Sequence, residues 1–402
     1  MKEFLHAHAT HPDWVMALAL VATQIEAQRR QPNKVQQPTL GWLYLTDDLA
    51  ASAGELLQAV QSRWPGVAWV GGVGRGVLAS GAEYIDEPAI AVMLCDIPRS
   101  QFRVFSGRHP LPATPRAGFQ AATAQVHADP HTADIGELIA EMADRTQTGY
   151  LFGGLVNASD PRACLHVADG VLSGGLSGVG FSEEVALLSR VSQGCQPTGP
   201  TREITQADHN LVFTLDGEPA LDCLLADLGL PSMQQPDALR RLRRTLAGLT
   251  HPGDDTLAHP GAFGTDTRVR ELIGFEPRRR GVALGDAVQS GMRLTFCSRD
   301  TAAARRDLMR ICAEIRDAVD LSRDHAPGQA IAGALYVSCA GRGGPHFGAP
   351  NAEMAIVQHA LGEVPLVGFF AGGEIARRHL YGYTGVLTVW CRALGQDDAP
   401  RA

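Results

Sequence analysis

The sequence predicts an α/β protein with mixed, largely antiparallel sheets, flanking helices and two related halves. Short apolar runs rich in β-forming residues alternate with segments of helical periodicity, which favours mixed structure. The order strand, helix, strand, glycine turn and strand occurs near both ends of the chain, which indicates an internal duplication. The 402 residues, 45% apolar and 19% charged, are enough for two or three domains with a substantial core.

The first copy of this order follows an N-terminal helix. Trp14, Leu18, Val21 and Ile25 recur at steps of three and four residues and predict that amphipathic helix. The segments after it predict, in order, a strand at 40–46, a helix carrying Leu56, Leu57 and Val60, a strand at 67–70, a short strand at 78–84 and a strand at 89–94.

The second copy lies near the end of the chain. It comprises a strand at 334–338, a helix at 351–361, a strand at 366–370, a turn at 371–374 and a strand at 386–390. We therefore expect segments 40–95 and 333–391 to share one strand order. The segment TGYLFGGLVNASD, 148–160, is a third variation, with strands predicted after it at 163–168 and 171–181. Glycine in each turn permits positive φ or a close approach of the backbone.

The middle of the chain holds the predicted domain boundary. Strands are predicted at 185–191 and 210–215, helices at 237–249 and 301–319, and a long exposed loop at 251–266. The polar, proline-containing segment 229–238 is the best boundary. We expect a helix and linker at 1–34, one domain at 35–230, a second at 231–395 and a disordered tail at 396–402.

Composition argues against several classes of partner. The net charge of −8 disfavours a nucleic-acid or anionic-membrane binder, and acids flank the arginine clusters at 240–244 and 278–280. The N-terminus lacks the cationic start and apolar run of a signal peptide, and the apolar run 15–22 is far shorter than the roughly 20 residues that span a bilayer. We expect a cytoplasmic protein that binds neither nucleic acid nor membrane.

Short motifs exclude further classes. The eight cysteines are scattered without a C-x-x-C pair, so we expect free thiols, no zinc or other metal site, and no cofactor. The glycines at 71–81 do not open an amphipathic helix, as a dinucleotide-binding loop would, and predict a structural turn. Phosphate-binding loop, nucleophile-elbow, H-E-x-x-H and kinase motifs do not occur in the sequence.

The candidate site is the strand end YVSCAGRGGPHFG, 336–348. Cys339 ends the strand, and Gly341, Arg342 and Gly343 follow in a loop. Three interpretations are open. Cys339 is a packed thiol, or it is a nucleophile activated by Arg342 with His346 as the base. In the third, it lines a cradle in which Arg342 binds a carboxylate through two hydrogen bonds.

A second ionisable group stands at the other glycine turn. Glu374 follows Gly373 in the segment AGGEI, where it is either a carboxylate at the start of a helix or part of the same site. We expect Cys339, Arg342 and Glu374 to share one concave face, with Arg342 binding a carboxylate and Glu374 an ammonium group. An amino acid would satisfy both.

Five motifs in the same order resemble the FIST domain family. ALYVSCAGRG and VPLVGFFAGGEI resemble the C-terminal FIST domain, and WLYLTDD, LFGGLVNASD and GCQPTGP are similar to parts of the N-terminal one. The resemblance covers residues 35–395. It implies a sensory, small-ligand-binding module of signal-transduction proteins, with amino acids as suspected ligands. It assigns ligand binding to Cys339, Arg342, Gly373 and Glu374.

The sequence departs from the family at 381–385, where YGYTG replaces an Asn-x-Thr-like motif, and this departure bears on the identity of the ligand. The prediction is a stand-alone sensor that binds an amino acid or related small carboxylate in a pocket between the two halves, with a signalling protein as partner. One alternative is a cysteine- or acid/base-dependent enzyme built on Cys339, His346 and Glu374. The other alternative is an adaptor that binds another protein.

Overall fold

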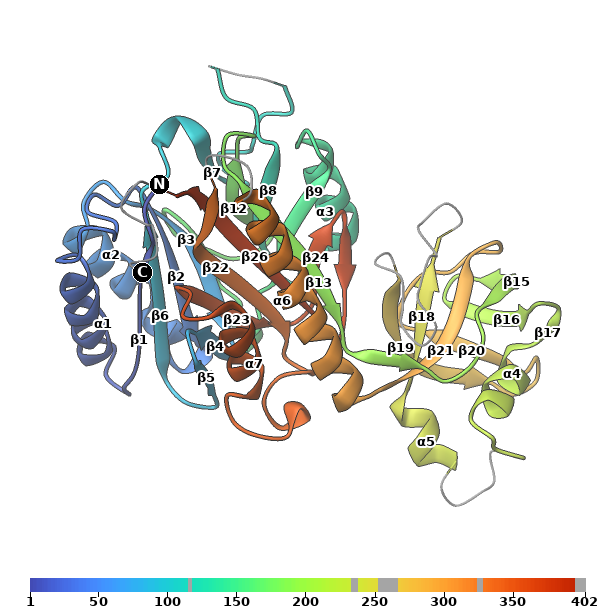
Figure 1. The fold of residues 1–402 in the computed structure, drawn as a ribbon. Helices are drawn as coiled ribbons and strands as arrows, with labels where there is room; N and C mark the ends of the chain where they lie inside the picture. Colours follow the sequence, from blue (N-terminus) through green and yellow to red (C-terminus); the bar gives the residue numbers. More distant parts are fainter. Residues whose placement is uncertain (115–117, 233–237, 252–266, 324–327, 395–402) are drawn as a thin grey trace. The chain divides into compact units, whose positions relative to one another are not determined.

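A computed structural model describes residues 1–114, 118–232, 238–251, 267–323 and 328–394. The chain forms two compact units (Figure 1). Unit 1 combines Met1–Ser192 with Arg305–Ala402, and unit 2 is the intervening segment Gln193–Ala304. Unit 2 is therefore an insertion into the chain of unit 1. The predicted tail at 396–402 and nearly all of the loop predicted at 251–266 lie outside the described residues.

Unit 1 consists of three copies of one supersecondary motif, each with a leading strand, a parallel strand pair joined by a helix, a hairpin and a closing strand. The first copy comprises β1 (Leu5–Thr10), α1 (Trp14–Gln28), β2 (Leu40–Thr46), α2 (Ala53–Arg63), β3 (Ala68–Gly74), the hairpin β4 (Gly76–Ala79) and β5 (Ala82–Ile85), and β6 (Ala89–Cys95). Strand β3 runs parallel to β2, and β6 runs antiparallel to it.

The second and third copies repeat these pairings. The second comprises β7 (Phe102–Ser106), β8 (Thr123–Ala128), α3 (Ile135–Asp144), β9 (Tyr150–Leu155), the hairpin β10 (His166–Ala168) and β11 (Val171–Leu172), and β12 (Leu176–Phe181). The third comprises β13 (Leu187–Gln193), α6 (Thr301–Arg323), β22 (Gln329–Cys339), α7 (Ala352–Leu361), β23 (Leu366–Ala371), the hairpin β24 (Glu374–Arg377) and β25 (His379–Tyr381), and β26 (Thr384–Ala393).

Each hairpin completes the sheet of a different copy. The three six-stranded sheets have the orders β1-β6-β2-β3-β10-β11, β7-β12-β8-β9-β24-β25 and β13-β26-β22-β23-β4-β5. The hairpin of the first copy thus completes the sheet of the third copy. In the same way, the hairpin of the third copy completes the sheet of the second, and the hairpin of the second completes the sheet of the first. The predicted relation between 40–95 and 333–391 is confirmed at the level of strand order, and 148–160 belongs to a third copy.

Glycine recurs in the second strand of each parallel pair because the two backbones nearly touch there. Gly71 and Gly153 have φ values of +148° and +141°, and a Cβ atom at either would lie 1.9 Å from a carbonyl oxygen of the neighbouring strand. At Gly368, the corresponding position of β23, that distance would be 1.7 Å. Only glycine fits at such a contact.

The core of unit 1 is aromatic where strands of different sheets meet. The rings of Trp42 and Trp390 lie 4.9 Å apart, and the rings of Tyr44 and Phe369 stack at 5.2 Å. Trp42 Nε1 donates a 2.6 Å hydrogen bond to the side-chain oxygen of Gln125, so the indole is satisfied although it is fully buried. Within the described residues no helix is long and apolar enough to cross a membrane.

Unit 2 is a small antiparallel barrel. It contains β14 (Cys195–Pro197), β15 (Arg202–Asp208), β16 (Leu211–Leu215), β17 (Glu218–Pro219), α4 (Ala220–Asp227), α5 (Ala238–Arg244), β18 (Thr245–Thr250), β19 (Arg268–Glu276), β20 (Gly281–Leu284) and β21 (Arg293–Arg299). The sheet runs β21-β15-β16-β20-β19-β18, and pairing of β18 with β21 closes it. Its own apolar core includes Leu224, Leu249 and Phe296.

Three element predictions need correction. The short strand expected at 78–84 is the hairpin β4–β5, because Gly81 adopts positive φ and turns the chain between the two strands. The helix expected at 237–249 ends at Arg244, and 245–250 is strand β18. Leu246 fits a helical period, but β18 pairs on both sides, with β19 and β21, and this pairing overrides the local pattern. The strand expected at 171–181 is two strands, because Gly174 and Gly175 both adopt positive φ and turn the chain between β11 and β12.

Candidate functional site

Strand β22 ends at Cys339, and the loop after it turns back on the strand. The backbone N–H groups of Arg342 and Gly343 donate to the Cys339 carbonyl at 2.9 and 3.0 Å. The turn brings Gly343 against Phe370, where a Cβ atom would lie 2.1 Å from the ring. The backbone of His346 belongs to a short 3-10 helix, Gly344–Phe347, but its side chain lies outside the described part of the structure.

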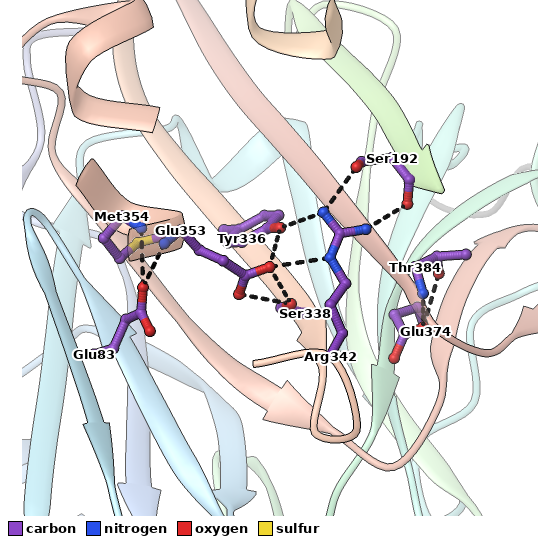
Figure 2. Close-up of polar contacts among 9 residues, drawn as sticks. All are labelled: Glu83, Ser192, Tyr336, Ser338, Arg342, Glu353, Met354, Glu374 and Thr384. Atoms are coloured by element: carbon purple, nitrogen blue, oxygen red, sulfur yellow. Dashed lines mark hydrogen bonds and ion pairs between the residues drawn. The ribbon is translucent and has the colours of Figure 1, made fainter. Parts of the chain in front are cut away.

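Arg342 is buried and makes its hydrogen bonds to other residues of the protein. Its side chain is 1% exposed. Nε donates to Glu353 Oε1 at 3.0 Å, and the two terminal nitrogens donate to the backbone carbonyl and hydroxyl of Ser192 at 2.9 and 2.8 Å (Figure 2). These bonds hold the loop to α7 and β13. They differ from the ligand contact expected from the sequence, and Arg342 does not line the cavity described below.

Glu353 balances this charge from the first turn of α7. Its carboxylate accepts from the hydroxyls of Tyr336 at 3.1 Å and Ser338 at 2.9 Å, in addition to Arg342 (Figure 2). Burial raises the pKa of Glu353, and the Arg342 guanidinium opposes the rise. A buried ion pair is tolerated only when its remaining hydrogen-bonding groups are satisfied, as they are here.

A second carboxylate, from the hairpin of the first copy, extends the cluster. Glu83 Oε1 accepts from the backbone N–H groups of Glu353 and Met354 at 2.8 and 3.1 Å, at the positive end of the α7 dipole (Figure 2). Its Oε2 is buried without a hydrogen-bond partner, and burial raises the pKa of Glu83 to about 7. The start of α7 is therefore held by a residue more than two hundred positions earlier in the chain.

Glu374 lies at the start of strand β24, and not at the start of a helix. It is fully buried, and its Oε2 accepts from Thr384 N at 3.0 Å and Thr384 Oγ1 at 2.7 Å (Figure 2). Burial raises the pKa of Glu374 to about 7, although the Thr384 hydrogen bonds, the Arg342 charge and the Cys339 thiol each act to lower it. Glu374 Oε1 is buried and has no hydrogen-bond partner.

Cys339 is packed beside Glu374, with 8% of its surface exposed. Burial, reinforced by the negative charge of Glu374, raises the pKa of the thiol to about 12. Such a thiol stays protonated at neutral pH, which disfavours a nucleophilic role. The structure thus gathers Cys339, Arg342 and Glu374 in one region but buries all three. Gly373 accepts from Leu155 N there at 2.8 Å, and Gly341 is an exposed loop residue.

A cavity of about 280 Å³ lies beside α7, which contributes Met354 and Val357 to its wall. Met354, whose N–H is bonded to Glu83, lines it together with Ser80 and Leu366. Lys34, 8% exposed, and Glu3 form an ion pair at its wall. The cavity therefore contacts the same helix start that the buried carboxylates hold.

His6 supplies the unsatisfied group of this cavity. Its Nδ1 is buried and has no hydrogen-bond partner. Burial lowers the pKa of His6 to about 4, and the nearby positive charge of Lys34 contributes. The imidazole is therefore neutral at physiological pH, and its Nδ1 is an unsatisfied polar atom in a residue that lines the cavity.

The sequence reasoning did not select Lys34, His6 or Glu353. Lys34 is one of only two lysines in a chain with 35 lysines and arginines, a signal that was present in the composition. His6 alternates with buried residues along β1 and carries no motif. In the sequence, Glu353 is an ordinary acidic residue in the first turn of a predicted helix. Only the fold places it against Arg342.

Comparison with known proteins identifies the family. The FIST N domain matches residues 39–218, and the FIST C domain matches residues 220–377. This chain belongs to the FIST family. FIST domains are sensory domains of signal-transduction proteins, and a small molecule is the kind of partner they take. The two matches meet within unit 2, next to α4, so each family domain contributes to both compact units.

Relatives of similar length occur in mycobacteria. Uncharacterized protein Rv0628c of Mycobacterium tuberculosis (strain H37Rv) is 30% identical over 383 residues, which cover 92% of this chain and 95% of that protein. Uncharacterized protein Mb0898c of Mycobacterium bovis is 30% identical over 384 residues, with the same coverage.

Proposed function

We propose that this FIST protein is a cytoplasmic sensor that binds a free amino acid or a closely related small carboxylate in the cavity at Lys34 and His6. The observation that carries the proposal is the pairing of a buried lysine with a half-buried, neutral histidine whose buried Nδ1 has no hydrogen-bond partner, both lining a cavity of metabolite size. The wall combines residues from both family matches with residues that precede the first.

The size of the cavity restricts the ligand. Small-molecule sites usually occupy about 300–1,000 Å³. At about 280 Å³ this cavity lies just below that range, which suits a molecule with the bulk of one amino acid.

The charges of the cavity favour a zwitterion. The Lys34 ammonium has three N–H donors, and Glu3 accepts from one of them. A ligand carboxylate bound by Lys34 and His6 would use the others. Glu3 and the exposed Glu363, which also line the cavity, are acceptors for the ligand's ammonium group.

The route from ligand to signal runs through α7. Met354 touches the cavity on one side and Glu83 on the other, and the next residue toward the N-terminus is Glu353, the partner of Arg342. The predicted site residues Cys339, Arg342 and Glu374 would then not contact the ligand. They would hold the loop after β22 in place, and a signalling partner would bind that loop.

Thermal denaturation and calorimetry with a panel of amino acids and small carboxylates test the proposal. A ligand at 100 times its Kd stabilises by about 2.7 kcal/mol. Lys34→Met should abolish this stabilisation, because losing one partner of a buried charged contact costs about 2–5 kcal/mol.

Lys2→Met is the matched control. Lys2 is the other lysine of the chain, is exposed, and bonds only the Pro32 carbonyl through its ammonium group. It should bind like the native protein. Ligand binding that survives Lys34→Met, or a complete panel without any stabilisation, would contradict the assignment.

A further inference from the structure

Helix α1 is apolar on the side that faces away from unit 1. Its inward side, which includes Leu18 and Ile25, is buried and packs on β1 and β6. The opposite side of such a helix is normally polar. Here Val15, Met16 and Leu20 lie on that side with 52%, 49% and 47% of their surfaces exposed, and Figure 1 shows α1 at the outer edge of unit 1. A contiguous exposed apolar surface of this kind indicates a site of association.

The outward side of α1 carries no charge along its length. Thr23 is exposed there, and its hydroxyl donates to the Ala19 carbonyl at 2.9 Å, so it needs no polar partner. Gln24 donates from Nε2 to a carbonyl of β1. Glu26 and Arg29, at the end of the helix, are half-buried and paired with each other. We call the α1 face the six exposed residues Val15, Met16, Ala19, Leu20, Thr23 and Ala27.

Side-chain size changes along the α1 face. The large residues lie toward the N-terminus of the helix, and Thr23 and Ala27 lie toward the C-terminus. Two copies of α1 that cross antiparallel about a two-fold axis at residues 21–22 bring Met16 opposite Ala27 and Leu20 opposite Thr23. Large side chains then pack against small ones in both halves, as close packing requires. A parallel pair would set large against large, so the α1 face fits a copy of itself in the antiparallel sense.

The charges at the two ends of α1 agree with this register. Asp13 caps the N-terminus, where its Oδ1 accepts from Val15 N at 2.9 Å, and Arg30 follows the C-terminus; both residues are exposed. The antiparallel pair places Asp13 of each copy beside Arg30 of the other, and it aligns the helix dipoles favourably. The C-terminal segment 395–402, GQDDAPRA, has too few apolar side chains to cover the face instead.

We propose that the α1 face is a homodimer interface, in which the α1 helices of two copies pack antiparallel about a two-fold axis. One helix from each copy makes a small interface, so the dimer should dissociate in the micromolar range. The inference rests on α1 alone and does not depend on the amino-acid site.

Sedimentation equilibrium of the full-length protein between about 1 and 200 µM tests the interface, because a micromolar dimer forms within this range. The native protein should be dimeric at the upper end. Leu20→Glu places two carboxylates near the two-fold axis and should weaken association by at least about a hundredfold. Met309→Glu is the matched control, because Met309 is 48% exposed on another helix, α6, and this variant should dimerise like the native protein.

Cross-linking through an introduced cysteine tests the antiparallel register. The eight native cysteines are buried and should not compete. At about 1.5 Å of rise per residue, the two copies of position 23 lie about 4 Å apart along the helix axes, and the two copies of position 15 lie about 20 Å apart. Thr23→Cys should therefore give a covalent dimer when it is oxidised with diamide, and Val15→Cys should not.

A native protein that stays monomeric at about 200 µM overturns the proposal, and the α1 face is then left to a partner of another kind. Leu20→Glu dimerising as tightly as the native protein overturns it too, as does a covalent dimer of Val15→Cys without one of Thr23→Cys. Circular dichroism establishes that each variant is folded, and Met16→Glu repeats the test at a second exposed position should Leu20→Glu fail to fold.

Discussion

Individual residues at the predicted site changed role when the chain folded. Arg342 was expected to bind a ligand carboxylate through two hydrogen bonds, and it donates a single hydrogen bond, from Nε, to the carboxylate of Glu353. Glu374 was expected to receive an ammonium group, and it receives the N–H and hydroxyl of Thr384. The residue types predicted the chemistry of their contacts, but the partners come from within the protein. The truncation of either member of the Arg342–Glu353 pair would leave an uncompensated buried charge.

Stability should fall as pH rises, because of the raised pKa of Glu374. The group titrates near 4.5 when unfolded and at about 7 when folded, so the folded state binds more protons between these values. The unfolding free energy therefore decreases from about pH 4.5 to about pH 7, by about 3 kcal/mol for this group, and is level above that. Glu374→Gln should lose less stability than the native protein over this window in urea denaturation at stepped pH.

Glu83 contributes in the same direction, since burial also raises its pKa to about 7, so part of the slope should remain in Glu374→Gln. Identical slopes for the variant and the native protein would show that Glu374 is ionised in the folded state.

At the scale of elements, the strand pairs determine where glycine is required. The sequence reasoning attributed the glycine pairs to close approach, and the contacts at Gly71, Gly153 and Gly368 are of that kind. By contrast, leucines at helical spacing in one segment do not by themselves establish a helix. In the 237–249 segment such leucines also fit a strand that is paired on both sides. Helix α7 is fixed by Glu83 from another copy, a contact that its own sequence does not contain.

Gly71→Ala should destabilise the protein severely. The added Cβ would lie 1.9 Å from the Leu43 carbonyl oxygen in a backbone conformation unfavourable for alanine, and we expect a loss of more than about 3 kcal/mol. Gly54→Ala in α2 is the control: no atom lies within 4 Å of its Cβ position, and alanine favours a helix by up to about 1 kcal/mol. Melting temperatures of the two variants should move in opposite directions, and equal shifts would refute the close contact.

At the scale of the molecule, the exchanged hairpins join the three copies into one cooperative unit. Each six-stranded sheet takes its last two strands from another copy, so no copy completes its own sheet. Unit 2 interrupts the third copy without entering these sheets, and its barrel is closed by its own strands.

A chain truncated after residue 182 should not fold. It retains the first two copies, but β9 lacks its neighbour β24, and the hairpin β4–β5 lacks β23. The exposed strand edges should lead to aggregation. A truncated protein with dispersed amide resonances and a cooperative melting transition would show that the copies are independent.

The sequence by itself determined the positions of most strands and helices of unit 1, the repeated motif, the need for glycine at the strand contacts and the FIST family. These properties depend on local patterns of apolar residues and of backbone freedom. A short segment has such a pattern whatever surrounds it in the folded protein. Only the tertiary structure decided that the hairpins are exchanged, that β18 is a strand, that Arg342 is neutralised by Glu353, and that Lys34 and His6 line a cavity. The Arg342–Glu353 pair joins residues 11 positions apart across a loop, and the other features depend on residues tens to hundreds of positions apart in the chain. Contacts between separate segments leave no mark in the pattern of any one segment.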